Sequence, residues 1–137
     1  MKTFLINFFP KYYKTKKFKV INNATLESLK KEKKIEPELL LLNKFIKTND
    51  YCFDIGANKG HYTYKLESLS KSKNIYAFDP IHENYIFLNK IFPNCKIYKY
   101  AISDKSINTQ FKIPIVKKKL IHTRGKLNFD IIEKNED

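Results

Sequence analysis

The apolar positions of this chain change period several times between residues 37 and 116, and the changes mark helices and strands. Behind Pro37, which suits the first position of a helix, apolar residues recur at helical spacing up to Ile46. A short apolar strand follows from Tyr51 to Ile55 and ends at Gly56. The later segments predict helices over Lys59–Leu69 and Glu83–Phe92 and strands over Asn74–Phe78, Lys96–Ile102 and roughly Thr109–Val116. This alternation predicts an α/β fold whose parallel sheet is joined by right-handed crossovers.

The chain divides into three expected parts. We expect a basic and aromatic leader with an exposed helix over residues 1–35, a partial globular domain over 36–116 and a charged tail without clear period over 117–137. The leader begins with an apolar stretch that is too short to span a membrane and lacks the cleavage site of a signal peptide. Its aromatic residues and lysines can contact an anionic membrane surface weakly, or the aromatics pack on the domain, which is the interpretation we favour.

Charge and cysteine content restrict the partners and the compartment. The 137-residue chain has a formal net charge of +13, yet Arg124 is its only arginine. Because nucleic-acid binders typically use arginine in defined basic motifs, we expect a solvated basic surface and no nucleic-acid partner. Cys52 and Cys95 stand far apart beside apolar residues, without the spacing of metal ligands. They indicate buried thiols in a reduced, cytoplasmic protein without a metal site.

The residues with most chemical content form the run Asp54–Gly60, at the first junction between strand and helix. Open α/β sheets bind ligands at such junctions. Gly56 and Gly60 allow a tight turn and the close approach of a ligand, and Asn58 can cap the helix that follows. The amide groups at the start of that helix suit a carboxylate or another anion.

A second acidic residue, Asp79, ends the second predicted strand. A carboxylate there can accept hydrogen bonds from both ribose hydroxyls of an adenosine-type ligand, and the same holds in dinucleotide-binding folds. The loop separates the two cofactors, because a dinucleotide site needs G-x-G-x-x-G and Asn58 stands where its second glycine would be. The carboxylate of Asp54 suits an ammonium group and would be unfavourable beside a pyrophosphate. The loop therefore favours S-adenosylmethionine, which carries both an ammonium and a sulfonium.

Each of these residues also has a structural interpretation, which stays open. Asp54 can cap the helix or bond loop amides, and Asp79 with Pro80 can begin an ordinary turn. His61 follows the glycines where a general base could stand, but no partner to orient it is visible, so we interpret it as a packing or surface residue. We interpret Asp104 as a turn residue that ends the third strand. Packing on a helix face is expected for Tyr62, Tyr64 and Tyr85.

Three motifs in order resemble those of the FkbM family of methyltransferases. They are FDIGANKGHYT (Phe53–Thr63), YAFDPIHEN (Tyr76–Asn84) and AISDK (Ala101–Lys105), and the resemblance covers roughly Glu36 to Ile115. It implies a Rossmann-like class I methyltransferase fold, S-adenosyl-L-methionine as cofactor and, most often in that family, methylation of hydroxyl oxygens on small molecules and glycans. It also implies which residues bind the cofactor. The methionine part would be held by Asp54, Gly56, Ala57, Asn58 and Gly60, the ribose by Asp79, and the adenine would lie near Ala101 and Ile102.

The chain departs from the family's pattern in two ways. Asp79 stands where the family more often has Glu, which shortens the reach of the carboxylate and keeps its chemistry. The family continues into further strands with a Lys-Ile-Asp-x-Glu-Gly type motif, and nothing in residues 117–137 matches it. Since the loops of these later strands normally carry the acceptor site, we expect a truncated chain. It would be the cofactor-binding front part of a methyltransferase for a small-molecule or glycan acceptor.

Two other interpretations stay open. The first is a non-catalytic module that binds the cofactor, or pairs through its exposed sheet edge with a partner chain that supplies the missing strands. The second is a basic, RNA-binding relative of the methyltransferases, whose RNA binding would depend steeply on salt. The sequence assigns no catalytic residue, no acceptor and no oligomeric state.

Overall fold

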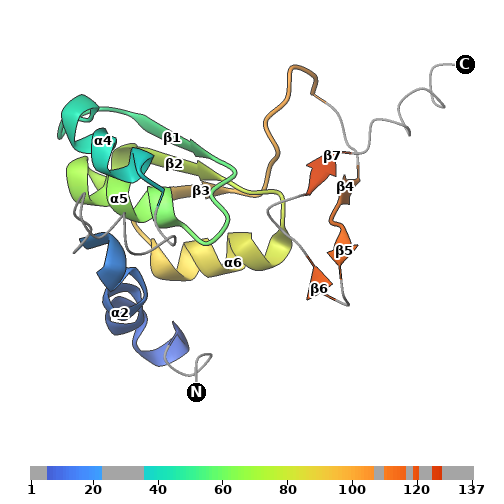
Figure 1. The fold of residues 1–137 in the computed structure, drawn as a ribbon, viewed down its shortest axis with the longest axis horizontal. Coiled ribbons are helices and arrows are strands. Elements are labelled where there is room, and N and C mark those ends of the chain that lie inside the picture. Colours follow the sequence, from blue (N-terminus) through green and yellow to red (C-terminus); the bar gives the residue numbers. More distant parts are fainter. Residues whose placement is uncertain (1–5, 23–35, 107–109, 117–118, 121–124, 128–137) are drawn as a thin grey trace, which may run out of the picture.

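A three-stranded parallel sheet forms the centre of the fold (Figure 1). The computed structural model describes residues 6–22, 36–106, 110–116, 119–120 and 125–127. The strands are β1 (Cys52–Ile55), β2 (Ile75–Phe78) and β3 (Lys96–Tyr98), in the order β1-β2-β3. Ile55 lies opposite Phe78 and Phe78 opposite Tyr98, so the carboxyl ends of all three strands meet at one edge. The predicted parallel α/β arrangement is confirmed, although β3 is shorter than predicted.

The helices that join these strands cover one face of the sheet. α5 (His61–Leu69) connects β1 to β2, and α6 (His82–Ile91) connects β2 to β3. α4 (Glu38–Phe45) begins after Pro37, as predicted, and contacts α5. A short 3-10 helix, Ser72–Asn74, leads into β2. Buried and exposed side chains alternate along the strands, and the buried ones are Cys52, Asp54, Ile75 and Ala77.

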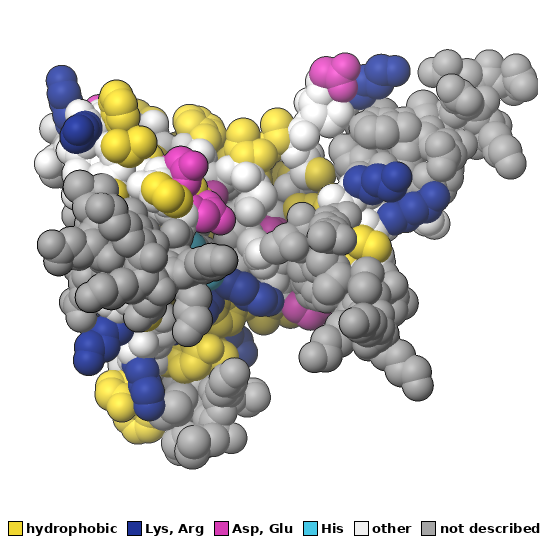
Figure 2. Space-filling view, viewed as in Figure 1, with side chains coloured by type: hydrophobic (Ala, Val, Ile, Leu, Met, Phe, Trp, Pro, Cys, Tyr) yellow, Lys and Arg dark blue, Asp and Glu magenta, His cyan; other side chains and the backbone are white. Residues whose placement is uncertain are grey.

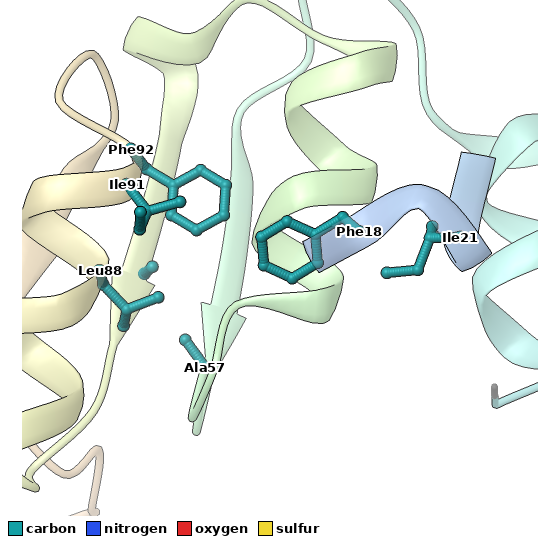
Figure 3. Close-up of a cluster of buried hydrophobic side chains, with 7 residues drawn as sticks. Phe18, Ile21, Ala57, Leu88, Ile91 and Phe92 are labelled. Carbon is teal, nitrogen blue, oxygen red and sulfur yellow. The ribbon is translucent and has the colours of Figure 1, made fainter. Parts of the chain in front are cut away.

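An N-terminal helix completes the core. α2 (Pro10–Asn22) contacts α5 and α6, and its Phe18 side chain is 0 % exposed. The Phe18 ring stacks on Tyr64 with 4.6 Å between centroids and lies 5.8 Å from the ring of Phe92. Residues 10–22 therefore belong to the domain, although they fall in the stretch predicted to be a leader. Figure 3 shows Phe18 pointing into a cluster that includes Ala57, Leu88, Ile91 and Phe92.

The predicted packing of the leader's aromatic residues holds only in part. Tyr13 is partly buried against the core, whereas Phe8, Phe9 and Tyr12 are exposed. The helix expected over residues 24–34 lies outside the described residues. None of the helices in the described part of the chain has the length and apolar character needed to cross a bilayer.

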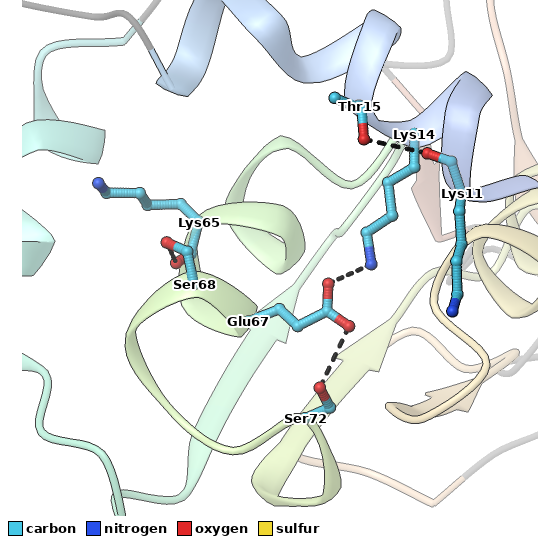
Figure 4. Close-up of polar contacts among 7 residues, drawn as sticks. All are labelled: Lys11, Lys14, Thr15, Lys65, Glu67, Ser68 and Ser72. Atoms are coloured by element: carbon cyan, nitrogen blue, oxygen red, sulfur yellow. Dashed lines mark hydrogen bonds and ion pairs between the residues drawn. The ribbon is translucent and has the colours of Figure 1, made fainter.

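Two lysines of α2 attach this helix to the rest of the domain. Lys14 forms an ion pair with Glu67 of α5, and the Ser72 hydroxyl donates to the other Glu67 oxygen at 3.2 Å (Figure 4). Lys17 donates to the backbone carbonyl of Lys59 at 2.9 Å. Burial, with a further contribution from the charge of Lys59, lowers the pKa of Lys17 to about 8. Some of the lysines, such as Lys14 and Lys17, thus form contacts within the protein and are not part of a solvated basic surface.

The segment after β3 does not extend the parallel sheet. The prediction of one strand over Thr109–Val116 is wrong, because β4 (Phe111–Lys112) and β5 (Ile115–Val116) are separate elements. Pro114 lies between them, and proline removes a backbone donor and interrupts a strand. β4 pairs antiparallel with β7 (Lys126–Leu127), and β5 pairs antiparallel with β6 (Lys119–Leu120). Two short strands therefore lie within residues 117–137, where the sequence shows no period.

The second face of the sheet carries a row of aromatic rings that the described helices leave exposed. The exposed fraction is 60 % for Phe53 and 65 % for Tyr100. Rings of neighbouring strands stack on one another, with Phe53 5.0 Å from Tyr76 and Phe78 5.2 Å from Tyr98 between centroids. Parallel sheets are normally covered on both faces, so this exposure is uncommon. We term this set, together with the exposed side chain of Ile55, the aromatic face. Its exposed rings are Tyr51, Phe53 and Tyr100, and its half-buried rings are Tyr76, Phe78 and Tyr98.

The packing of α2 predicts the effect of a substitution at Phe18. Phe18→Ala should lower the free energy of unfolding by about 3–5 kcal/mol, because it removes a fully buried ring and leaves a cavity. Tyr12→Ala, at an exposed position of the same helix, should change it by less than about 0.5 kcal/mol. Urea denaturation followed by circular dichroism measures both. Equal effects of the two substitutions would contradict the integration of α2 into the core.

Candidate functional site

The loop between β1 and α5 has a constrained backbone that β2 holds in place. Gly56, Asn58 and Gly60 have positive φ angles of 80°, 48° and 78°. Asparagine is among the few non-glycine residues that adopt this conformation at low cost. The amides of Gly56 and Ala57 both donate to the carbonyl of Phe78 at 2.9 Å. We term residues 56–60 the glycine loop; it is fastened to the end of β2.

The two glycines of this loop serve different purposes. A Cβ atom at Gly60 would lie 2.6 Å from the side chain of Phe92 and 2.9 Å from that of Leu88. A Cβ atom at Gly56 would meet nothing within 4 Å. Gly60 therefore allows the start of α5 to lie against the side chains of Leu88 and Phe92, whereas Gly56 leaves open space in front of the loop.

Asp54 reaches from β1 to the first turn of α5. Its Oδ2 accepts a hydrogen bond from the Thr63 hydroxyl at 2.5 Å, within a buried environment. Burial raises the pKa of the Asp54 carboxyl, the hydrogen bonds from Thr63 oppose that rise, and the charge of Asp79 adds to it. Asp54 therefore contacts the first turn of α5, but it is not the cap that the sequence allowed, because the N-cap residue is Gly60 and no side chain caps the helix. The cap expected from Asn58 is wrong for the same reason.

Asp79 joins the glycine loop to the loop after β2. Its Oδ2 accepts from the Asn58 amide at 2.7 Å, and its Oδ1 accepts from the Ile81 amide at 3.0 Å and the Asn84 side chain at 3.1 Å. An ionised carboxylate has about four lone-pair positions, so these three bonds use most of its capacity. No backbone turn is assigned over residues 79–81; the Asp79 side chain instead closes an Asx-turn with the Ile81 amide. The three bonds leave acceptor capacity for about one ribose hydroxyl, where the sequence predicts two.

A cavity of about 550 Å³ opens at this edge of the sheet. One wall comes from the C-terminal strands, through Phe111, Gly125 and Lys126. Figure 2 shows acidic side chains gathered near the middle of the face that carries this opening. Gly60 is the one residue of the predicted cofactor site that does not line the cavity. The predicted residues that line it are Asp54, Gly56, Ala57, Asn58, Asp79, Ala101 and Ile102.

Several lining residues were not expected from the sequence. Glu36 and Tyr62 both line the cavity, although Tyr62 was interpreted as a packing residue. Burial and the hydrogen bond between the Tyr62 hydroxyl and Glu36 raise the pKa of Tyr62. The only sequence signal for Glu36 was its position immediately before Pro37, the residue that opens a helix. Phe111 and Lys126 had none, because antiparallel pairing of distant segments brings them to the cavity.

His61 lines the cavity and also packs against the core. Its ring lies edge-on to the ring of Phe18, with 5.6 Å between centroids. Burial lowers the pKa of His61, the charge of Lys17 lowers it further, and the charge of Glu36 opposes them. The predicted packing role of His61 is confirmed by the contact with Phe18. Tyr64, which stacks on the same ring, also packs as predicted.

The cavity has the opposite charge to the chain as a whole. Its described lining holds three carboxylates, from Glu36, Asp54 and Asp79, and one lysine, Lys126. The complete chain has a net charge of +13. Because a cleft lined by one sign of charge attracts the other, the site favours a cationic ligand over a polyphosphate.

The remaining chemical residues lie outside this site. Within the described ranges, no group of three or more histidine, cysteine or acidic side chains is placed to hold a metal ion. Cys52 and Cys95 are free, and burial, followed by the charge of Glu67, raises the pKa of Cys95 to about 12. The prediction that Asp104 ends the third strand is wrong, because β3 ends at Tyr98; Asp104 lies in a bend, with the Ser103 hydroxyl 3.0 Å from its Oδ1.

Comparison with known proteins gives no relative for this chain. No family model, no curated protein and no solved structure matches it. The residues and the geometry of the site are therefore the basis for inferring its function.

The buried carboxyl of Asp54 predicts a pH-dependent effect of its neutral isostere. Its pKa is raised in the folded chain, so folding binds its proton more tightly and ionisation of Asp54 reduces stability as pH rises through that pKa. Asp54→Asn removes this charge. The stability of the variant relative to the natural chain should therefore increase between pH 4 and pH 7. Urea denaturation at both pH values measures this; a relative stability that falls as pH rises would contradict the buried charge.

Proposed function

We propose that this chain binds S-adenosyl-L-methionine and forms the cofactor-binding part of a methyltransferase that resembles the FkbM family. The observation that carries the proposal is the cavity at the carboxyl edge of the sheet, which gathers the residues of three separate sequence motifs. Ligands of open α/β sheets bind at this edge. The acidic lining supports a cofactor with an ammonium and a sulfonium rather than a dinucleotide.

The lining residues fit the parts of this cofactor. Asp79 can accept a hydrogen bond from the ribose, and Ala101 with Ile102 offers an apolar contact for the adenine. Gly56 has open space in front of its Cα atom, which lets the methionine part approach the backbone. The amides of Gly56, Ala57 and Asn58 already donate within the protein, so they position the loop rather than bind a ligand anion.

The reaction we propose is transfer of the sulfonium methyl group to a hydroxyl oxygen of a small molecule or glycan, in the cytoplasm. The sulfonium methyl is already reactive, so catalysis consists mainly of aligning the acceptor oxygen for in-line attack. The residues that line the cavity would bind the cofactor. The acceptor would be bound by other parts of the protein or by a partner.

A second candidate function, a module that depends on a partner chain, is supported by the aromatic face. Exposed rings such as Phe53 and Tyr100 cover one face of a parallel sheet, and such faces are normally covered by helices. A partner layer over this face would bury the rings and could supply the acceptor site. The chain has a single arginine and no defined basic motif, so we favour a protein partner over RNA.

Calorimetric titration with S-adenosylhomocysteine, the stable product of methyl transfer, tests the proposed cofactor. We expect saturable binding to the full chain with one site. A folded chain that does not bind this compound would contradict the proposal and favour a structural role. Circular dichroism of the same sample establishes that the chain is folded.

Substitution of Ile102 tests the place of the adenine. Ile102→Ala should weaken binding of S-adenosylhomocysteine by about tenfold, because it removes three apolar carbons that are each worth about 0.8 kcal/mol when fully buried, and an open contact buries them only in part. Ile102 is half exposed without ligand, so the stability of the chain should hardly change. Ile86→Ala, at an exposed position of α6 away from the cavity, is the matched control and should leave binding unchanged. Unchanged affinity of the Ile102 variant would contradict this position of the adenine.

A further inference from the structure

We propose that the carboxylate of Glu36 receives the ammonium group of the cofactor's amino-acid end, the role that the sequence predicts for Asp54. This inference rests on the proposed function and names the residue that selects the amino-acid end of the ligand. Glu36 lines the cavity, yet it belongs to none of the three sequence motifs.

The two other carboxylates of the cavity are engaged within the protein. Asp54 is buried and bonded to the Thr63 hydroxyl at 2.5 Å. Asp79 is 4 % exposed and accepts three hydrogen bonds. Adding an ammonium to either of them would require competing with these bonds or entering a crowded position. Both residues contribute negative potential, but neither is the most accessible partner for a cation.

Glu36, in contrast, is exposed at the mouth of the same cavity. The Tyr62 hydroxyl lies close enough for the Glu36 carboxylate to raise the pKa of Tyr62, and Glu36 keeps most of its acceptor capacity. Its charge also acts on His61. Tyr62 and His61 are the first residues of α5, directly after the glycine loop. Glu36 therefore lies beside the part of the cavity assigned to the methionine moiety.

The chemistry of the pair is specific for a charged amine. An ionised carboxylate that meets an ammonium forms charge-assisted hydrogen bonds, which are about twice as strong as neutral ones. The neighbouring Tyr62 hydroxyl, whose pKa is raised by burial and by Glu36, is a neutral donor beside the carboxylate and adds no competing charge. An adenosine without the amino-acid end would gain nothing from this arrangement.

Two compounds separate this role from adenosine binding. S-adenosylhomocysteine carries the ammonium, and 5′-methylthioadenosine has the same nucleoside and sulfur without the amino-acid end. By calorimetry with the full chain, Glu36→Gln should weaken S-adenosylhomocysteine about tenfold to a hundredfold, as expected for lost charge-assisted bonds. Binding of 5′-methylthioadenosine should change less than about twofold, since its contacts do not involve Glu36.

Glu38→Gln is the matched control. Glu38 is an exposed carboxylate in the first turn of α4 that does not line the cavity, so its substitution makes the same change in net charge nearby. It should leave both affinities unchanged. Tyr62→Phe should weaken S-adenosylhomocysteine to a smaller extent than Glu36→Gln, because it removes only the neutral donor beside the carboxylate.

The outcomes distinguish this inference from the proposed function. If the natural chain binds both compounds but Glu36→Gln weakens them equally, or weakens neither, the role of Glu36 is overturned and the adenosine site stands. If the natural chain is folded and binds neither compound, the proposed function falls, and the role of Glu36 with it.

Discussion

The carboxylate of Asp79 holds together the two loops that form the site. Through three hydrogen bonds it fixes the amides of Asn58 and Ile81 and the side chain of Asn84. Asn84 is itself fully buried and also accepts a hydrogen bond from Lys59. Without this carboxylate, two loop amides and a buried side-chain amide would lose their acceptor, which costs about 1–3 kcal/mol for each group left unsatisfied. The bond from the Asn58 amide to Asp79 also holds the glycine loop in its conformation with positive φ angles.

A site built on buried acids has an energetic cost that the rest of the domain must offset. Burial disfavours the ionised form of Asp54, and the nearby charge of Asp79 disfavours it further. Two lysines of α2 form stabilising contacts with the rest of the domain. Lys14 pairs with Glu67, and Lys17 donates to the carbonyl of Lys59, within the glycine loop. The N-terminal helix α2 therefore contacts the glycine loop, while Asp54 and Asp79 line the cavity.

The elements of the fold could be predicted because local patterns determined them. The short apolar run of β1, the helix behind Pro37 and the glycines after Ile55 are each visible within a few residues of sequence. Packing of the leader's aromatic residues on the domain was predicted, but the helix and Phe18, its fully buried side chain, were not, because Phe18 stands among lysines and shows no helical stripe. The wall at Lys126 was missed because its position depends on pairing between β4 and β7, which no local pattern encodes.

The net positive charge of the chain affects how its copies associate through the aromatic face. A row of exposed rings on an open sheet would favour association between copies of the chain. A net charge of +13 opposes such contacts, since like-charged molecules repel at distances up to about 8 Å at physiological ionic strength. At about 1 M salt the screening length falls to roughly 3 Å, and that repulsion is largely lost. The net charge thus opposes association between copies of the chain through the aromatic face.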